Sequence, residues 1–220
     1  MPEPVHHRTA RIVYDRSADL YVETVGTRVS SAFEAPLDRA VLDVFAERVR
    51  MAPTRTVLDA GCGPGRVAAY LADRGLMASG VDISTEMLAR ARAAHPALTF
   101  TEGSLTDLSV ADHSIGGVVY WYSIIVTPPD ELDAVWRELH RVLAPGGRAL
   151  VAFQIGGDET VDRPDAYGSG VLLHLVRHSI EGVTRSLEDA GFVVQATIQR
   201  APELPHESTS QGFVLAGRQT

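Results

Sequence analysis

The chain has 220 residues, a length typical of one globular domain that buries a full core. Its 20 basic and 28 acidic residues give a net charge of −8 without any run of Lys or Arg, which argues against a nucleic-acid-binding surface. The longest apolar stretch, residues 118–126, is far shorter than the ~20 residues of a membrane-spanning helix. We therefore expect neither a nucleic acid nor a membrane as a partner.

The first 55 residues precede the first expected strand. Tyr14 and Tyr21 lie in a polar, weakly periodic stretch, and we expect residues 1–35 to form an N-terminal segment of their own. Apolar residues recur at helical spacing over 37–49, which predicts a helix. We expect residues 36–220 to form a single domain.

From residue 56 onward, apolar strands alternate with helices. The expected strands are 56–60, 78–83, 98–101, 117–123 and 148–153. Ser84 is the expected N-cap of the second intervening helix, and Asp130 that of a later helix with one apolar stripe. This alternation predicts a parallel sheet with helices on both faces.

The pattern changes after the fifth strand. Residues 155–180 begin as a polar loop, and a helix is expected near 179–190. The last strands are expected at 192–198 and 212–216, and their short connection contains two prolines and no helical stripe. Such a connection suits an antiparallel pair, so we predict an α/β fold with a seven-stranded, mostly parallel sheet whose last strand is antiparallel.

The first strand ends in a glycine-rich turn, Gly-Cys-Gly-Pro-Gly at 61–65. Glycines permit positive φ and a close approach of backbone to ligand, and the following helix is expected to offer free N–H groups. Asp59 could orient this turn or meet an ammonium group. Asp82 ends the second strand, where its carboxylate could accept hydrogen bonds from both hydroxyls of a ribose. The alternative for Asp82 is a helix-capping role beside Ser84.

The chain is not expected to hold a metal or a disulfide. Its eight histidines are dispersed without metal-ligand spacing. Cys62 is the only cysteine, and residues 1–9 lack the apolar run of a signal peptide. The expected compartment is therefore the cytoplasm.

Several segments together carry a family resemblance. They read V-L-D-A-G-C-G-P-G at 57–65, G-V-D-I-S-x-x-M-L at 80–88 and R-V-L-A-P-G-G at 141–147, with W-Y-S at 121–123 and P-P-x-E-L at 128–132. Over nearly its whole length the chain resembles small bacterial class I S-adenosylmethionine-dependent methyltransferases. The resemblance implies a Rossmann-like fold, S-adenosylmethionine as cofactor and a monomer or homodimer. It implies methyl transfer to an O, N or C nucleophile of a small molecule, mainly by proximity and orientation.

The resemblance also implies which residues contact the cofactor. They are Tyr14, Tyr21, Asp59, Gly61, Cys62, Gly63, Gly65, Asp82, Ile83, Met87, Ser104, Leu105, Tyr120 and Trp121. Asp82 would hold the ribose, while Ile83 and Met87 would flank the adenine. Ser104 stands where the family often has an Asp that meets the adenine amine, and Asp107 is an alternative acceptor. Tyr14 and Tyr21 would close over the site as a helical lid, or would be ordinary packed aromatics.

Four residues are the candidates for the acceptor site: Tyr122, Ser123, Gln154 and His174. Residues 155–180 would cap the acceptor side of the site. Where the family often has a His beyond W-Y-S, this chain has Val126. His174 and Tyr122 are therefore the remaining candidates for a catalytic role.

Two other functions stay open. A methyltransferase-like protein could bind the cofactor and catalyse a cyclisation, which the departures at Ser104 and Val126 motivate. The glycine turn is shared with NAD-dependent oxidoreductases, although their G-x-G-x-x-G pattern would need Gly at Arg66. Residues 127–130 lack the full signature of nucleic-acid amine methyltransferases, and we reject that function.

Overall fold

The computed structural model describes residues 4–52 and 54–219. Its helices are α1 (Val5–Val25), α2 (Pro36–Arg50), α3 (Arg66–Ala72), α4 (Thr85–Ala94), α5 (Leu132–Val142) and α6 (Ile180–Asp189), with short 3-10 turns η1 (Ile124–Val126), η2 (Pro129–Glu131) and η3 (Ala166–Gly168). Its strands are β1 (Thr56–Ala60), β2 (Met77–Asp82), β3 (Thr99–Glu102), β4 (Ile115–Trp121), β5 (Leu143–Gln154), β6 (Glu159–Arg163), β7 (Leu173–Arg177), β8 (Phe192–Arg200) and β9 (Gln211–Arg218).

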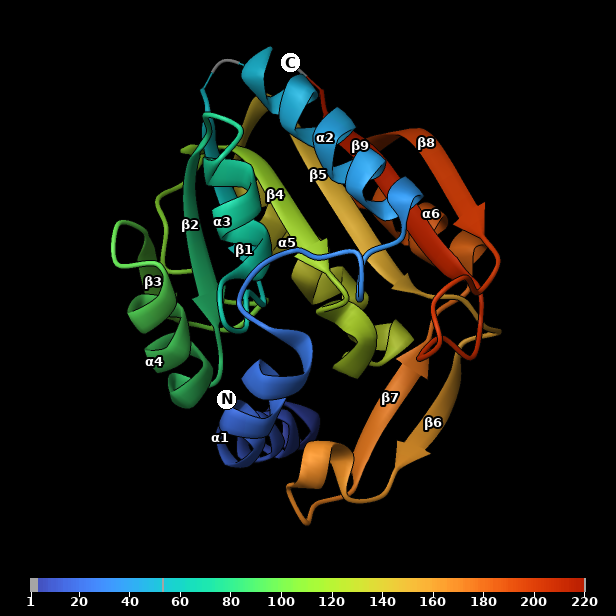
Figure 1. Ribbon diagram of the computed structural model, residues 1–220. Coiled ribbons are helices and arrows are strands. Elements are labelled where there is room, and N and C mark those ends of the chain that lie inside the picture. The colour runs from blue at the N-terminus through green and yellow to red at the C-terminus, as the bar shows by residue number, and fades with distance from the viewer. Residues whose placement is uncertain (1–3, 53, 220) are drawn as a thin grey trace.

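Within the described residues, seven strands form the main sheet in the order β3-β2-β1-β4-β5-β9-β8 (Figure 1). β1 to β5 pair in parallel, and β9 runs antiparallel to both of its neighbours. The predicted Rossmann-like α/β fold is confirmed. The parallel strands all end at one edge, which is where such sheets bind ligands.

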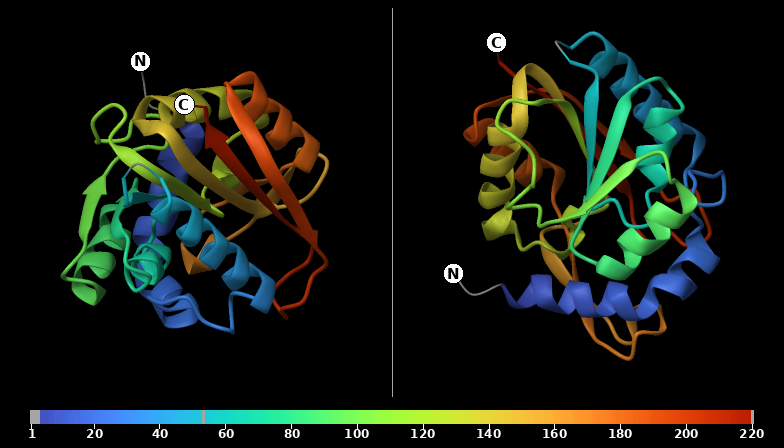
Figure 2. Two further views of the ribbon diagram at one scale, coloured as in Figure 1. Left: turned by 90° about the horizontal axis from the view of Figure 1, so that it is seen from above. Right: turned by 90° about the vertical axis from the view of Figure 1, so that its left-hand side faces the viewer.

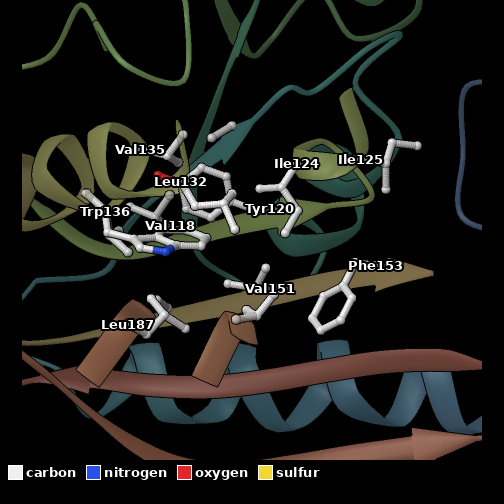
Figure 3. Close-up of a cluster of buried hydrophobic side chains, with 14 of the residues drawn as sticks. Val118, Tyr120, Ile124, Ile125, Leu132, Val135, Trp136, Val151, Phe153 and Leu187 are labelled. Atoms are coloured by element: carbon white, nitrogen blue, oxygen red, sulfur yellow. The ribbon is translucent and has the colours of Figure 1, made fainter. Parts of the chain in front are cut away.

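Side chains alternate between two cores on the two faces of the sheet. Val118 and Tyr120 of β4 join the core beneath α5 and α6 (Figure 3), whereas Val119 and Trp121 join the core beneath α2 and α3. Both faces of the central strands are therefore buried, and their ends are held at fixed positions.

Two segments lie at the carboxyl edge of the parallel strands. α1 crosses this edge, and the β6–β7 hairpin lies beside it (Figures 1 and 2). The expected loop over 155–180 is thus wrong in part, because β6 and β7 pair from Glu159–Arg177 to Arg163–Leu173. Residues 1–3 of the expected N-terminal segment lie outside the described residues.

Of the two N-caps predicted from the sequence, one is present in the structure and the other is not. Ser84 caps α4, where its Oγ accepts a hydrogen bond from the amide of Met87 at 3.1 Å. Asp130 does not cap α5, because it lies inside η2 and the helix begins at Leu132. In the described part of the chain, no helix combines the length and apolarity needed to cross a membrane.

Candidate functional site

A cavity of about 580 Å³ lies at the carboxyl edge of the sheet. Its walls come from α1, the glycine turn after β1, the ends of β2, β4 and β5, and the hairpin. Small-molecule sites commonly have volumes of ~300–1,000 Å³. The cavity is therefore large enough for a small ligand.

The glycine turn needs glycine for two separate reasons. Gly61, Gly63 and Gly65 have φ values of 78°, 52° and 81°, in the left-handed region. A Cβ on Gly61 would overlap the Cβ of Ser123, whereas a Cβ on Gly63 would meet no atom within 4 Å. The turn therefore packs against the end of β4 at Gly61 and leaves open space at Gly63.

The amides of this turn are engaged within the protein. Gly61 and Cys62 donate to the carbonyl of Val81 at 2.8 and 3.0 Å, and Gly65 donates to the carbonyl of Cys62 at 3.0 Å. Gly63 donates to Oδ2 of Asp82 at 2.7 Å. These hydrogen bonds hold the turn in shape.

Asp82 lies at the boundary between turn and cavity. Its Oδ1 accepts a hydrogen bond from the amide of Ser84 at 2.8 Å, and its Oδ2 accepts the one from Gly63. Burial raises its pKa, and these backbone hydrogen bonds oppose that rise. An ionised carboxylate offers about four acceptor positions, so Asp82 keeps capacity for a ligand in the cavity that it lines.

Asp59 and Cys62 support the turn from beneath. Both line a separate hollow of about 50 Å³ and not the main cavity. Oδ2 of Asp59 accepts a hydrogen bond from the amide of Ala68 at 2.9 Å, and burial raises the pKa of this carboxyl to about 7. The Cys62 thiol packs against Gly80 of β2, since a Cβ added to Gly80 would lie only 2.7 Å from Sγ. Burial raises the pKa of this thiol.

Four more residues expected to contact the cofactor line the cavity, namely Ile83 and Met87, which were expected to flank the adenine, and Ser104 and Leu105. The Oγ of Ser104 is 3.0 Å from Oγ1 of Thr106. Asp107, the alternative acceptor, is not part of the cavity wall. This region is therefore an apolar slot with one hydroxyl.

Two contacts hold the N-terminal segment over the cavity. Tyr14 and Tyr21 line it and pack with Tyr167 of η3, with ring centroids 5.3–6.3 Å apart. Arg66, at the start of α3, forms a buried ion pair with Glu34, whose side chain is 2% exposed. The pair joins the segment after α1 directly to the glycine turn.

Three of the predicted acceptor residues, Tyr122, Ser123 and Gln154, also line the cavity. Tyr122 has φ 57°, a left-handed conformation that is uncommon for a non-glycine residue. Burial raises the pKa of its phenol. Tyr122 therefore stays protonated at neutral pH.

Comparison with known proteins bears on this arrangement. Residues 57–147 match the family described as "Methyltransferase domain". They form a methyltransferase domain. The resemblance seen in the sequence is confirmed, and the matched residues include the glycine turn, Asp82 and Trp121.

A curated relative of this methyltransferase domain is the malonyl-[acyl-carrier protein] O-methyltransferase of Enterobacter lignolyticus. It is 33% identical over 111 residues, which are 50% of this chain and 43% of that protein. The chain therefore spans less than half the length of that relative.

Two solved structures share the fold over nearly the whole chain. The [4+2]-cyclase SpnF matches with a TM-score of 0.78 and 17% identity, covering 99% of this chain and 97% of that one. The 1,6-didemethyltoxoflavin-N1-methyltransferase of Burkholderia thailandensis, solved with S-adenosylhomocysteine, matches with a TM-score of 0.69 and 19% identity, covering 100% and 93%.

Two side chains that the sequence assigned to the site do not line the cavity. Tyr120 is fully buried in the core and packs edge-on against Trp136 at 5.6 Å (Figure 3). His174 is on the outer face of β7, with Nδ1 2.7 Å from Oδ1 of Asp162. Strand alternation explains both, since Trp121 beside Tyr120, and Leu173 beside His174, line the cavity instead.

Gly65 is also absent from the cavity wall. A Cβ there would lie 2.7 Å from the ring of Phe100 and 3.1 Å from that of His95. Gly65 thus permits close packing of the turn against β3 and α4. Its contribution to the site is indirect.

The sequence missed part of the cavity wall. These residues come from α1, the segment after it, the start of α3, η1 and the residue after it, the hairpin with η3, the residues before β9 and the start of β9: His7, Ala10, Phe33, Glu34, Arg66, Ile125, Thr127, Ala166, Tyr167, Leu173, Leu175, His206, Glu207 and Gln211. The apolar alternation of Leu173 and Leu175 was the one local signal that could have indicated a strand facing a cavity.

Proposed function

We propose that this chain transfers a methyl group from S-adenosylmethionine to a small-molecule acceptor, mainly by holding donor and acceptor together. The observation that carries this proposal is that one cavity at the carboxyl edge of the sheet is lined by both sets of residues. Asp82 and the glycine turn line one part of it, and Ser123 and Gln154 line another. Such alignment can lower a reaction barrier by roughly 7–11 kcal/mol.

The residues around Asp82 fit the proposed cofactor. Asp82 has spare acceptor positions for ribose hydroxyls, and Ile83 and Met87 offer apolar surface to an adenine. Gly63 leaves open space where any side chain would intrude. When bound, S-adenosylmethionine supplies a methyl group already activated on a sulfonium.

The chain's own residues would position groups and exclude water. Tyr14 and Tyr21 would cover the cofactor from the lid, and Trp121 would border it from the end of β4. Tyr122 would donate a hydrogen bond and would not act as a base, because burial raises its pKa. We assign no catalytic base, since His174 lies on the outer face of the hairpin.

Two broader expectations also stay proposals. The single cysteine is consistent with the reducing cytoplasm as the compartment. A monomer or a homodimer is the proposed assembly, and a small molecule is the proposed partner.

Transfer of a labelled methyl group tests the proposed function. Purified protein is incubated with S-[methyl-³H]adenosylmethionine and fractionated small metabolites, and labelled product is separated from labelled cofactor. We expect labelled product with wild type and His174→Ala, and at least tenfold less with Asp82→Ala. Binding of S-adenosylhomocysteine without any labelled product would contradict methyl transfer and would favour the cyclisation alternative.

A further inference from the structure

One wall of the cavity is apolar. Its residues belong to one buried cluster and come from α1, η1, η3 and β7: Ala10, Ile125, Ala166, Leu173 and Leu175. η1 packs against both β5 and β7, so this wall adjoins the end of β5. We call these five residues the hairpin wall. Apolar ligand surface would replace water against them.

Uncharged polar groups without partners lie next to this wall. The hydroxyls of Ser123 and Thr127 are buried and have no hydrogen-bond partner in the described part of the chain, although both residues line the cavity. Gln154, the last residue of β5, also lines the cavity. Buried polar groups in native proteins are nearly always paired, so the two hydroxyls indicate a missing ligand or water.

Two buried carboxylates of the cavity have arginine partners, whereas Asp82 accepts hydrogen bonds from backbone amides. Glu34 pairs with Arg66, and Oε2 of Glu207 accepts a hydrogen bond from Nη1 of Arg200 at 2.7 Å. Burial tends to raise the pKa of Glu207, but its bonds with Arg200 outweigh this and lower the pKa to about 2.

The other titratable groups leave the hairpin wall without a buried counter-ion. Burial lowers the pKa of His7 on α1, which keeps that imidazole neutral at pH 7. Arg163 and Asp165 line the cavity at the exposed end of the hairpin, where water screens their charge. An ionised ligand against the hairpin wall would thus lose hydration without gaining a buried partner of opposite charge.

We infer that the acceptor is a neutral, largely apolar molecule that packs on the hairpin wall and presents one hydroxyl or carbonyl group to Ser123, Thr127 and Gln154. The inference rests on the proposed function and narrows its substrate class. Ser123 touches Gly61, so this polar group would lie beside the glycine turn, where donor and acceptor must meet.

A matched series of naphthalene probes tests the class. 2-Naphthol is neutral, 2-naphthoate is an anion and 2-naphthylmethylammonium is a cation, all on the same ring system. Binding of each is measured by calorimetry to protein saturated with S-adenosylhomocysteine. We expect 2-naphthol to bind at least tenfold more tightly than either ion. Equal or tighter binding of an ion, or no binding of 2-naphthol, would overturn the inference.

Two variants locate the probe. Thr127→Val keeps the side-chain shape and should weaken 2-naphthol binding roughly fivefold, through one lost hydrogen bond. Leu175→Ser should weaken it further, whereas His174→Ser, on the outer face of the same strand, should leave it unchanged. Unchanged affinity in Thr127→Val, or equal losses in the two β7 variants, would contradict the assignment.

Binding of S-adenosylhomocysteine, measured in the same samples, distinguishes a failure of the substrate class from a failure of the proposed function. If it binds but the probes show no preference for the neutral compound, the substrate class is wrong and the proposed function stands. If it does not bind, the proposed function fails and the inference fails with it.

Discussion

The part of the cavity around Asp82, which we propose for the cofactor (the cofactor half), and the part around Thr127, which we propose for the acceptor (the acceptor half), are built in different ways. Around Asp82, backbone hydrogen bonds from Gly63 and Ser84 fix the site. These residues all lie in one short stretch of the chain, from the turn after β1 to the residue before α4. Around Thr127, the wall comes from α1, η1, the hairpin and the residues before β9, which are far apart in the chain. Local backbone geometry therefore sets the first half, and tertiary packing sets the second.

The largest expected effect tests a long-range contact beside the glycine turn, the ion pair of Arg66 with Glu34. Arg66→Met should leave the buried Glu34 carboxylate without its charged partner, with only the hydrogen bond from the Ser30 amide remaining, and should lower the free energy of unfolding by about 3–5 kcal/mol. The matched control is Asp73→Ala, which removes the exposed pair with Arg28 and should cost about 0–1 kcal/mol. Urea denaturation measures both. Equal losses would show that the buried pair does not hold the N-terminal segment to the turn.

The free energy of unfolding, measured over a pH series, tests the buried carboxyl of Asp59 below the glycine turn. The folded pKa of Asp59 is raised to about 7, so its contribution to stability is present below about pH 4 and is lost as pH rises to about 7. At ~1.4 kcal/mol per pH unit this amounts to roughly 4 kcal/mol. Asp59→Asn should lack this loss, and its unfolding free energy relative to wild type should rise across that range. A difference that does not change with pH would contradict the buried, protonatable carboxyl.

Two alanine substitutions separate backbone strain from crowding within the turn. Gly61→Ala and Gly63→Ala both place a side chain at positive φ, but only the first overlaps Ser123. Gly61→Ala should therefore destabilise the protein by about 1–3 kcal/mol more than Gly63→Ala. Thermal and urea unfolding of the two variants provide the comparison. Equal destabilisation would mean that the turn does not pack against the end of β4.

The two halves also differ in how much of them the sequence predicted. The strands, the glycine turn and the position of Asp82 follow from local patterns, and the structure places them as expected. The ion pair of Arg66 with Glu34 was missed, because it depends on the path of the chain after α1.

The wrong or missed residues of the cavity have separate structural causes. Whether His174 or its neighbours face the cavity depends on the phase of β7, which has only five residues and pairs with a polar strand. Tyr120 was wrongly placed for a related reason, since β4 is apolar on both faces and gives no alternation to read. Thr127 lies in a turn that no periodic pattern describes.

Calorimetric titration tests the central claim, that Asp82 and the glycine turn form a site for S-adenosylmethionine. S-adenosylhomocysteine should bind wild type and Asp107→Ala with the same affinity, and Asp82→Ala at least tenfold more weakly, which corresponds to about 1.4 kcal/mol. NAD⁺ should give no binding heat with any of the three proteins. Tight binding of NAD⁺, or unchanged affinity of Asp82→Ala for S-adenosylhomocysteine, would contradict the account.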